Sequence, residues 1–174
     1  MPTTDVDTRA VVVADWIKRL ADDERKRDAV RLGEEQAIAR KAALVREDGP
    51  RLIAELRATL ARDVDAFRQE FAENRSRDLS FEDTADGGFI VTTLTPTTVS
   101  LAVTPNLSQA SVLCHYRFTF RTGMPPREER FELLFGGDEL DKLRITHHGT
   151  GRVFATSDAL SEFLLAPVFT GRPR

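Results

Sequence analysis

The distribution of aromatic residues, glycine and proline changes at about residue 76, and this change constrains the fold most. The 174-residue chain has 13 aromatic residues (11 Phe, one Trp and one Tyr), of which ten follow residue 76; the others are Trp16, Phe67 and Phe71. Between residues 3 and 77 the only glycines and prolines are Gly33, Gly49 and Pro50. Helices contain few such residues, whereas strands favour aromatic side chains and turns use glycine and proline. We therefore expect an α+β protein with a helical part at 1–75 and an antiparallel sheet domain at 76–174, either separate or joined in one compact unit.

Charge is nearly balanced along the whole chain. The formal net charge is −3; residues 1–75 carry 15 basic and 16 acidic side chains, and residues 76–174 carry 10 and 12. General binding to nucleic acid or to anionic membranes needs a net basic face. We therefore predict neither a nucleic-acid nor a membrane partner.

The location of the protein is predicted from its first residues and its cysteine content. The start has no basic region, and its longest apolar run, 11–14, is too short for a signal peptide or a membrane helix. Cys114 is the single cysteine, so no internal disulfide is possible. We expect a cytoplasmic protein.

Residues 51–75 have the clearest helical pattern in the chain. Asp48 can cap this helix, and Pro50 suits its first turn. Apolar residues recur at steps of three and four and form a narrow stripe opposite a charged face. The members of this stripe are Ile53, Leu56, Leu60, Val64, Phe67 and Phe71.

Residues 8–47 also have a helical pattern, with two apolar patches separated by the charged segment 22–28. The first patch is Val13, Trp16, Ile17 and Leu20, and the second is Val30, Ala37, Ile38, Leu44 and Val45. The charged segment is either a solvated helix with ion pairs along its surface or a break between two helices. Glu47–Pro50 resembles the turn of an antiparallel pair, so we predict a long helical hairpin.

The hairpin has two possible roles: it covers the sheet, or it binds a protein partner or a second copy of the chain. The stripe over 53–71 is as narrow as a coiled-coil seam, which favours a helical partner. We therefore predict a homo-oligomer or a protein complex, with this stripe as the interface. On this hypothesis Leu60→Asp or Phe67→Asp dissociates the assembly and leaves the sheet folded.

From Leu79 onward the hydrophobic period becomes two, which predicts strands. Alternation covers 98–104, 111–121, 128–135 and 143–148, and residues 89–94 are apolar on both sides. The links between these segments are short and turn-like, so neighbouring strands pair in order. We expect a meander of five to seven strands, followed by a short helix that Thr156 or Ser157 caps and Pro167 ends.

No nucleotide-binding or catalytic motif occurs in the sequence. Cys114 shares its strand face with apolar residues and is predicted to be an inert buried thiol. Its neighbour His115 points to the opposite face. His147 shares its strand face with the apolar residues Leu143 and Ile145, so we expect it at the edge of the core. We therefore predict no catalytic residue, no metal site and no cofactor.

One group of polar residues shares the opposite sheet face and is our candidate ligand site. Its members are His115, Arg117, Arg130, Glu132, Arg144 and His148. A pairing in which residue numbers sum to about 278 places Arg130 near His148. Arginine forks bind carboxylates and phosphates, so the group suits an anion or an acidic partner. Ordinary cross-strand ion pairs on a solvated face are the favoured interpretation.

The sequence leaves two classes of function open. The leading hypothesis is a non-enzymatic interaction or assembly module that acts through its long amphipathic helices. The alternative is a small-molecule or anion-binding domain, or an enzyme, that uses the polar face of a curved sheet.

Overall fold

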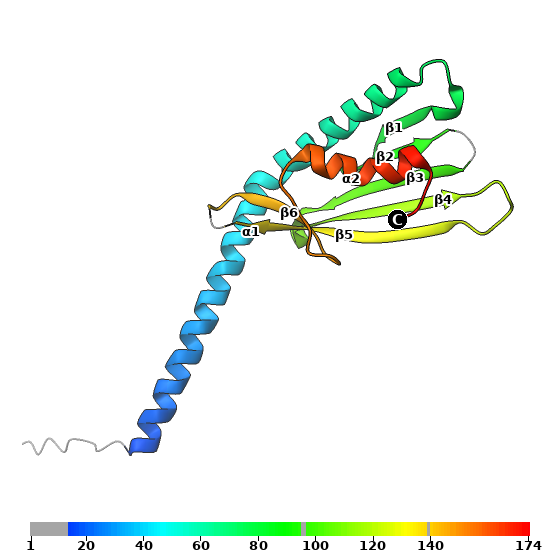
Figure 1. The fold of residues 1–174 in the computed structure, drawn as a ribbon. Helices are drawn as coiled ribbons and strands as arrows, with labels where there is room; N and C mark the ends of the chain where they lie inside the picture. The colour runs from blue at the N-terminus through cyan, green and yellow to red at the C-terminus, as the bar shows by residue number, and fades with distance from the viewer. Residues whose placement is uncertain (1–13, 95–96, 139) are drawn as a thin grey trace, which may run out of the picture. The chain divides into compact units, whose positions relative to one another are not determined.

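The structure is a computed structural model that describes residues 14–94, 97–138 and 140–174. These residues form two α-helices, two short 3₁₀ turns and seven strands (Figure 1). In chain order the elements are α1 (Asp15–Glu70), η1 (Arg75–Arg77), β1 (Leu79–Asp83), β2 (Phe89–Thr93), β3 (Thr98–Asn106), η2 (Leu107–Gln109), β4 (Ser111–Thr119), β5 (Arg127–Gly137), β6 (Leu143–His147), β7 (Val153–Phe154) and α2 (Ser157–Thr170).

The chain divides into two compact units, residues 1–40 and residues 41–174. The described part of the first unit is the N-terminal part of α1. The second unit contains the rest of α1, the whole sheet and α2. None of the described helices is both long and apolar enough to cross a membrane.

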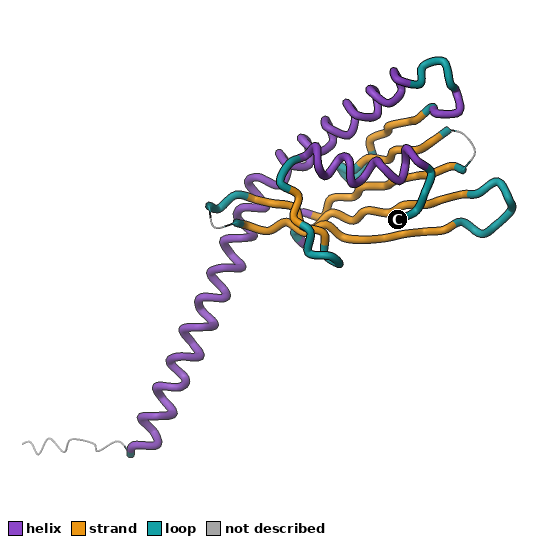
Figure 2. Tube along the Cα trace, in the orientation of Figure 1, coloured by secondary structure: helices purple, strands orange, loops and turns teal. Residues whose placement is uncertain are grey.

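The sheet is a seven-stranded antiparallel meander in the order β1 to β7, so the predicted α+β class and meander topology are confirmed (Figure 2). The predicted assignment of strand residues to a buried and an exposed face is also confirmed. On β4, Val112, Cys114, Tyr116 and Phe118 are buried, whereas Leu113, Arg117 and Thr119 are exposed. Short turns connect most of the neighbouring strands, which is why local sequence signals are sufficient to predict their order.

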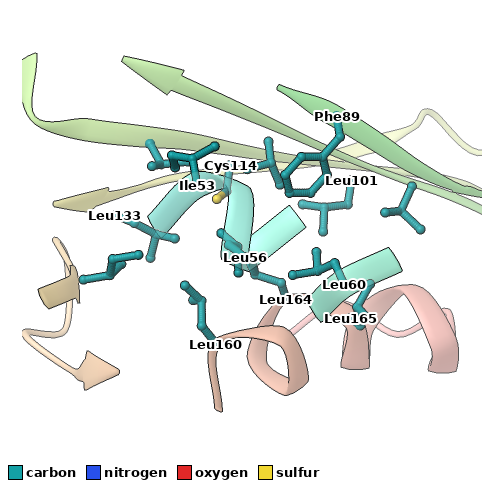
Figure 3. Packing of buried hydrophobic residues seen from close by; sticks show 14 of the residues in the cluster. Ile53, Leu56, Leu60, Phe89, Leu101, Cys114, Leu133, Leu160, Leu164 and Leu165 are labelled. Atoms are coloured by element: carbon teal, nitrogen blue, oxygen red, sulfur yellow. The ribbon is translucent and has the colours of Figure 1, made fainter. Parts of the chain in front are cut away.

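Both helical segments of the second unit pack on the apolar face of this sheet. The core contains Leu56 and Leu60 of α1, Leu101 of β3, and Leu164 and Leu165 of α2 (Figure 3). The Tyr116 hydroxyl, buried among these residues, donates a hydrogen bond of 2.7 Å to the Leu164 carbonyl. The opposite sheet face has no described element packed over it.

The predicted helical hairpin is not present, because α1 runs without a break from Asp15 to Glu70. Pro50 lies inside this helix and removes one backbone donor, so the carbonyl of Arg46 loses its usual partner. Both residues are exposed, and water can satisfy that carbonyl. Gly49 is buried where Leu107 approaches the helix backbone, so it serves close packing and not a turn.

The charged segment 22–28 is continuous helix. Three ion pairs of the i,i+3 type span this region: Asp22–Arg25, Glu24–Arg27 and Asp28–Arg31, with N–O distances of 2.6, 2.6 and 3.1 Å. Such pairs stabilise a solvated helix by a few tenths of a kcal/mol each. The predicted helix start at residue 8, and Val13 in the first apolar patch, lie outside the described residues.

The short C-terminal helix is confirmed, with one correction. Thr156 is its N-cap, and its hydroxyl accepts a hydrogen bond of 3.1 Å from the Ala159 amide. Pro167 does not end the helix, which continues to Thr170 and is closed by Gly171 in the left-handed region at φ 66°.

Candidate functional site

The stripe predicted as an interface lies largely inside the chain's own core. Ile53, Leu56, Leu60 and Val64 are buried against the sheet and α2. These four side chains present no surface to a second chain in this structure. The cleanest amphipathic pattern in the sequence therefore marks where α1 covers the sheet.

The last two members of the stripe lie near the end of α1. Phe67 is half-buried, and its ring stacks on Phe169 of α2 with centroids 4.1 Å apart. Phe71 is 38% exposed, and Arg77 lies 5.3 Å from the centroid of its ring. Contacts within the second unit thus cover part of the surface of the Phe67 and Phe71 rings.

Four of the six candidate ligand residues lie in neighbouring cross-strand rows of β4 and β5: His115, Arg117, Arg130 and Glu132. His115 lies opposite Arg130, and Arg117 lies opposite Glu128. Glu128, which the sequence pattern does not single out, is central: its Oε2 atom is 3.3 Å from both His115 Nε2 and Arg130 Nη2. His115 Nε2 is shielded from solvent and makes no hydrogen bond of normal geometry there. Glu128 thus forms an ion pair with Arg130 on its own strand and contacts His115 across the strand pair, on a largely exposed face.

The other residues of this group are displaced from the predicted positions. Partners on β5 and β6 sum to 280, for example Leu133 with His147, so His148 lies beside Glu132 and not Arg130. The His148 amide donates a 2.9 Å hydrogen bond to the Glu132 carbonyl. Arg144 pairs with Asp138 at 2.8 Å instead of joining the group. This hydrogen-bonded pair holds the pKa of the Asp138 carboxyl below its usual value.

The buried thiol and the core-edge histidine behave as their strand positions predict. Burial raises the pKa of Cys114 to about 12, so its thiolate is not accessible at neutral pH. His147 is half-buried against the Phe131 ring, and its Nδ1 accepts a 3.1 Å hydrogen bond from the Thr150 amide. The described residues contain no group of three or more His, Cys, Asp or Glu side chains arranged to hold a metal ion.

Six large apolar side chains on the N-terminal segment of α1, residues 15–40, are exposed. Four of them share one side of the helix: Trp16, Leu20, Val30 and Ile38, with exposed fractions of 61%, 52%, 62% and 69%. At 100° per residue these four positions fall within a sector of about 80°. Ile17 and Leu32 are also exposed but lie outside this sector.

Three charged residues complete the same side of the helix. Asp23, Arg27 and Glu34 fall in the same sector and continue the spacing of four and three residues that coiled coils use. We call this set the seam: Trp16, Leu20, Asp23, Arg27, Val30, Glu34 and Ile38. All seven members are exposed.

Comparisons of the chain with protein-family models, with curated proteins and with solved structures found no match. The function of the protein is therefore inferred from the geometry of the chain itself.

Proposed function

We propose that the protein is a non-enzymatic assembly module in which the N-terminal segment of α1 pairs with the same segment of a second copy. The observation that carries this proposal is the seam, because it places large apolar side chains in solvent along one side of a helix. Most of the stability of helices in proteins comes from packing of an apolar face, so a partner along the seam would stabilise this segment.

The charges within the seam favour an antiparallel pair of identical chains. In a parallel pair in register each residue meets its own copy, so Asp23, Arg27 and Glu34 each face a like charge. In an antiparallel pair with residue numbers that sum to about 50, Asp23 faces Arg27 of the second copy, and this contact occurs twice. The same register places Leu20 against Val30 of the second copy.

The chain offers a matched pair of variants to test this function. Leu20 and Leu32 are 52% and 55% exposed on the same helical segment, but only Leu20 belongs to the seam. We expect light scattering to give twice the chain mass for wild type and Leu32→Asp, and the mass of one chain for Leu20→Asp. A monomeric wild type, or equal masses for the two variants, would contradict the proposal.

A further inference from the structure

A cleft of about 680 Å³ lies in the second unit where α1, α2 and three strands end or begin. Its walls come from η1, the start of β1, the end of β2, the segment after β4 and the last turn of α2. None of the six predicted ligand residues lines it. The volume is within the usual range for sites that bind small molecules.

The charged side chains that line this cleft are all arginines: Arg75, Arg77 and Arg121. No aspartate or glutamate is among the lining residues. Within the described part of the chain, Arg75 and Arg121 have no ion-pair partner, in contrast to most arginines of α1. The cleft therefore combines three positive charges without a carboxylate that neutralises them.

The turn that carries two of these arginines is held in place by its own hydrogen bonds. The Asn74 side chain accepts a 3.0 Å hydrogen bond from the Ser76 amide, and the Asn74 carbonyl accepts one of 2.9 Å from the Arg77 amide. The Arg77 guanidinium donates to the Phe169 carbonyl at 3.3 Å, which ties η1 to the end of α2. The positions of both arginine backbones are thus set before any ligand binds.

The rest of the lining is apolar or carries hydroxyl groups. Phe67 and Phe169 form a stacked pair at the wall, with Leu79 and Val168 beside them. Thr93 and Thr170 add hydroxyl groups. A ligand that fits this lining has a multiply charged anionic group for the arginines and an apolar or aromatic part for the phenylalanine wall.

We propose that this cleft binds a small organic dianion with an apolar part, through Arg75, Arg77 and Arg121. Phosphate monoesters and dicarboxylates share this chemistry, since arginine forks match both anionic groups. This site is independent of the assembly proposed for the N-terminal segment, because all its residues lie in the second unit.

The test is an NMR titration of the full chain with phenyl phosphate, with phthalate and with neutral benzyl alcohol. The variants are Arg75→Gln and Arg121→Gln, and the control is Arg46→Gln, an exposed arginine on the part of α1 in the second unit that does not line the cleft. All three substitutions replace exposed side chains, so the folded state is retained.

We expect at least one dianion to shift the amide signals of residues 75–77 and 168–171, and benzyl alcohol to shift them little. Each cleft variant should weaken binding about tenfold, the effect of losing one charge-assisted hydrogen bond, and Arg46→Gln should not. If neither dianion shifts these signals at millimolar concentration, or if the control weakens binding as much as the cleft variants do, the proposal is wrong. The relative affinities of the two dianions identify the preferred anionic group.

Discussion

Gly49 of α1 packs directly against Leu107 of η2: a Cβ atom built on Gly49 would lie 3.0 Å from Leu107 Cδ2. This distance is shorter than an ordinary carbon–carbon contact. The absence of a side chain at position 49 therefore lets the helix approach the turn that follows β3.

Gly49→Ala should lower the free energy of unfolding of the second unit by about 1 kcal/mol. Alanine favours the helix by about 1 kcal/mol over glycine, but overpacking against Leu107 costs about 1–3 kcal/mol. In a Leu107→Ala background the clash is absent, and Gly49→Ala should stabilise by about 1 kcal/mol. Urea unfolding of the four proteins measures both effects, and an equal effect of Gly49→Ala in the two backgrounds would show that the contact has no energetic role.

Leu60→Ala should lower the free energy of unfolding by about 2–5 kcal/mol, because Leu60 is completely buried between the sheet and α2. Leu60→Asp would place a charge in this core and should prevent folding of the sheet. The sequence pattern predicts that Leu60→Asp dissociates an assembly and leaves the sheet folded. Because Leu60 is buried, we now expect Leu60→Asp to unfold the sheet. Chemical denaturation monitored by circular dichroism tests it, with exposed Leu32→Ala as the control that should change stability by less than about 0.5 kcal/mol.

Protonation of His147 should lower the free energy of unfolding as the pH falls below about 6.5. Burial, and next the positive charge of Arg174, lower the pKa of His147 in the folded chain; His148 acts in the same direction. The unfolded chain therefore binds more protons in the window between the folded pKa and the unfolded value, so stability is present above this window and lost on acidification through it. Urea midpoints from about pH 5 to about pH 8 should rise with pH more steeply in wild type than in His147→Gln. Identical slopes would exclude His147 as the group responsible.

The sheet could be predicted from the sequence because its signals are local. Alternation on each strand assigns its residues to the two faces, and short turns leave little choice of topology. The predicted pairing of β5 with β6 is two residues out of register, because it assigns Gly136 and Gly137 to the turn. They belong to β5, opposite Arg144 and Leu143, and the turn is instead organised by Asp138, whose Oδ1 accepts the amides of Leu140 and Lys142.

The continuous helix and the burial of the stripe over 53–71 could not be predicted, because the sequence signals of both features have two physical meanings. Gly49–Pro50 is typical of a turn, yet glycine also permits close packing and an exposed proline is tolerated within a helix. The stripe over 53–71 suits a helical partner and a sheet equally well, since both require apolar side chains every three or four residues. The weaker pattern over 16–38 is interrupted by charges. Only the exposure of Trp16, Val30 and Ile38 in the structure distinguishes it from a core stripe.

The cleft arginines have no sequence signature either. Arg75 and Arg77 lie in a short charged stretch after α1, and Arg121 is 44 residues further along the chain. Their proximity results from the meander. Because neighbouring strands are antiparallel, the end of β4 and the start of β1 lie at the same end of the sheet. Such a group can be found only when the strand order is known.

Exchange of the two central charges tests whether the chains self-associate in antiparallel orientation along the seam. Asp23→Arg and Arg27→Asp each place like charges at both central contacts of the pair, so each variant alone should give the mass of one chain by light scattering. An equimolar mixture should give twice the chain mass, because arginine at 23 then faces aspartate at 27 and the native Arg27 faces the native Asp23. Disulfide crosslinking checks orientation: a mixture of Leu20→Cys and Val30→Cys chains should form the 20–30 crosslink in preference to 20–20. A mixture that stays monomeric, or crosslinks of 20 with 20, would exclude antiparallel pairing along the seam.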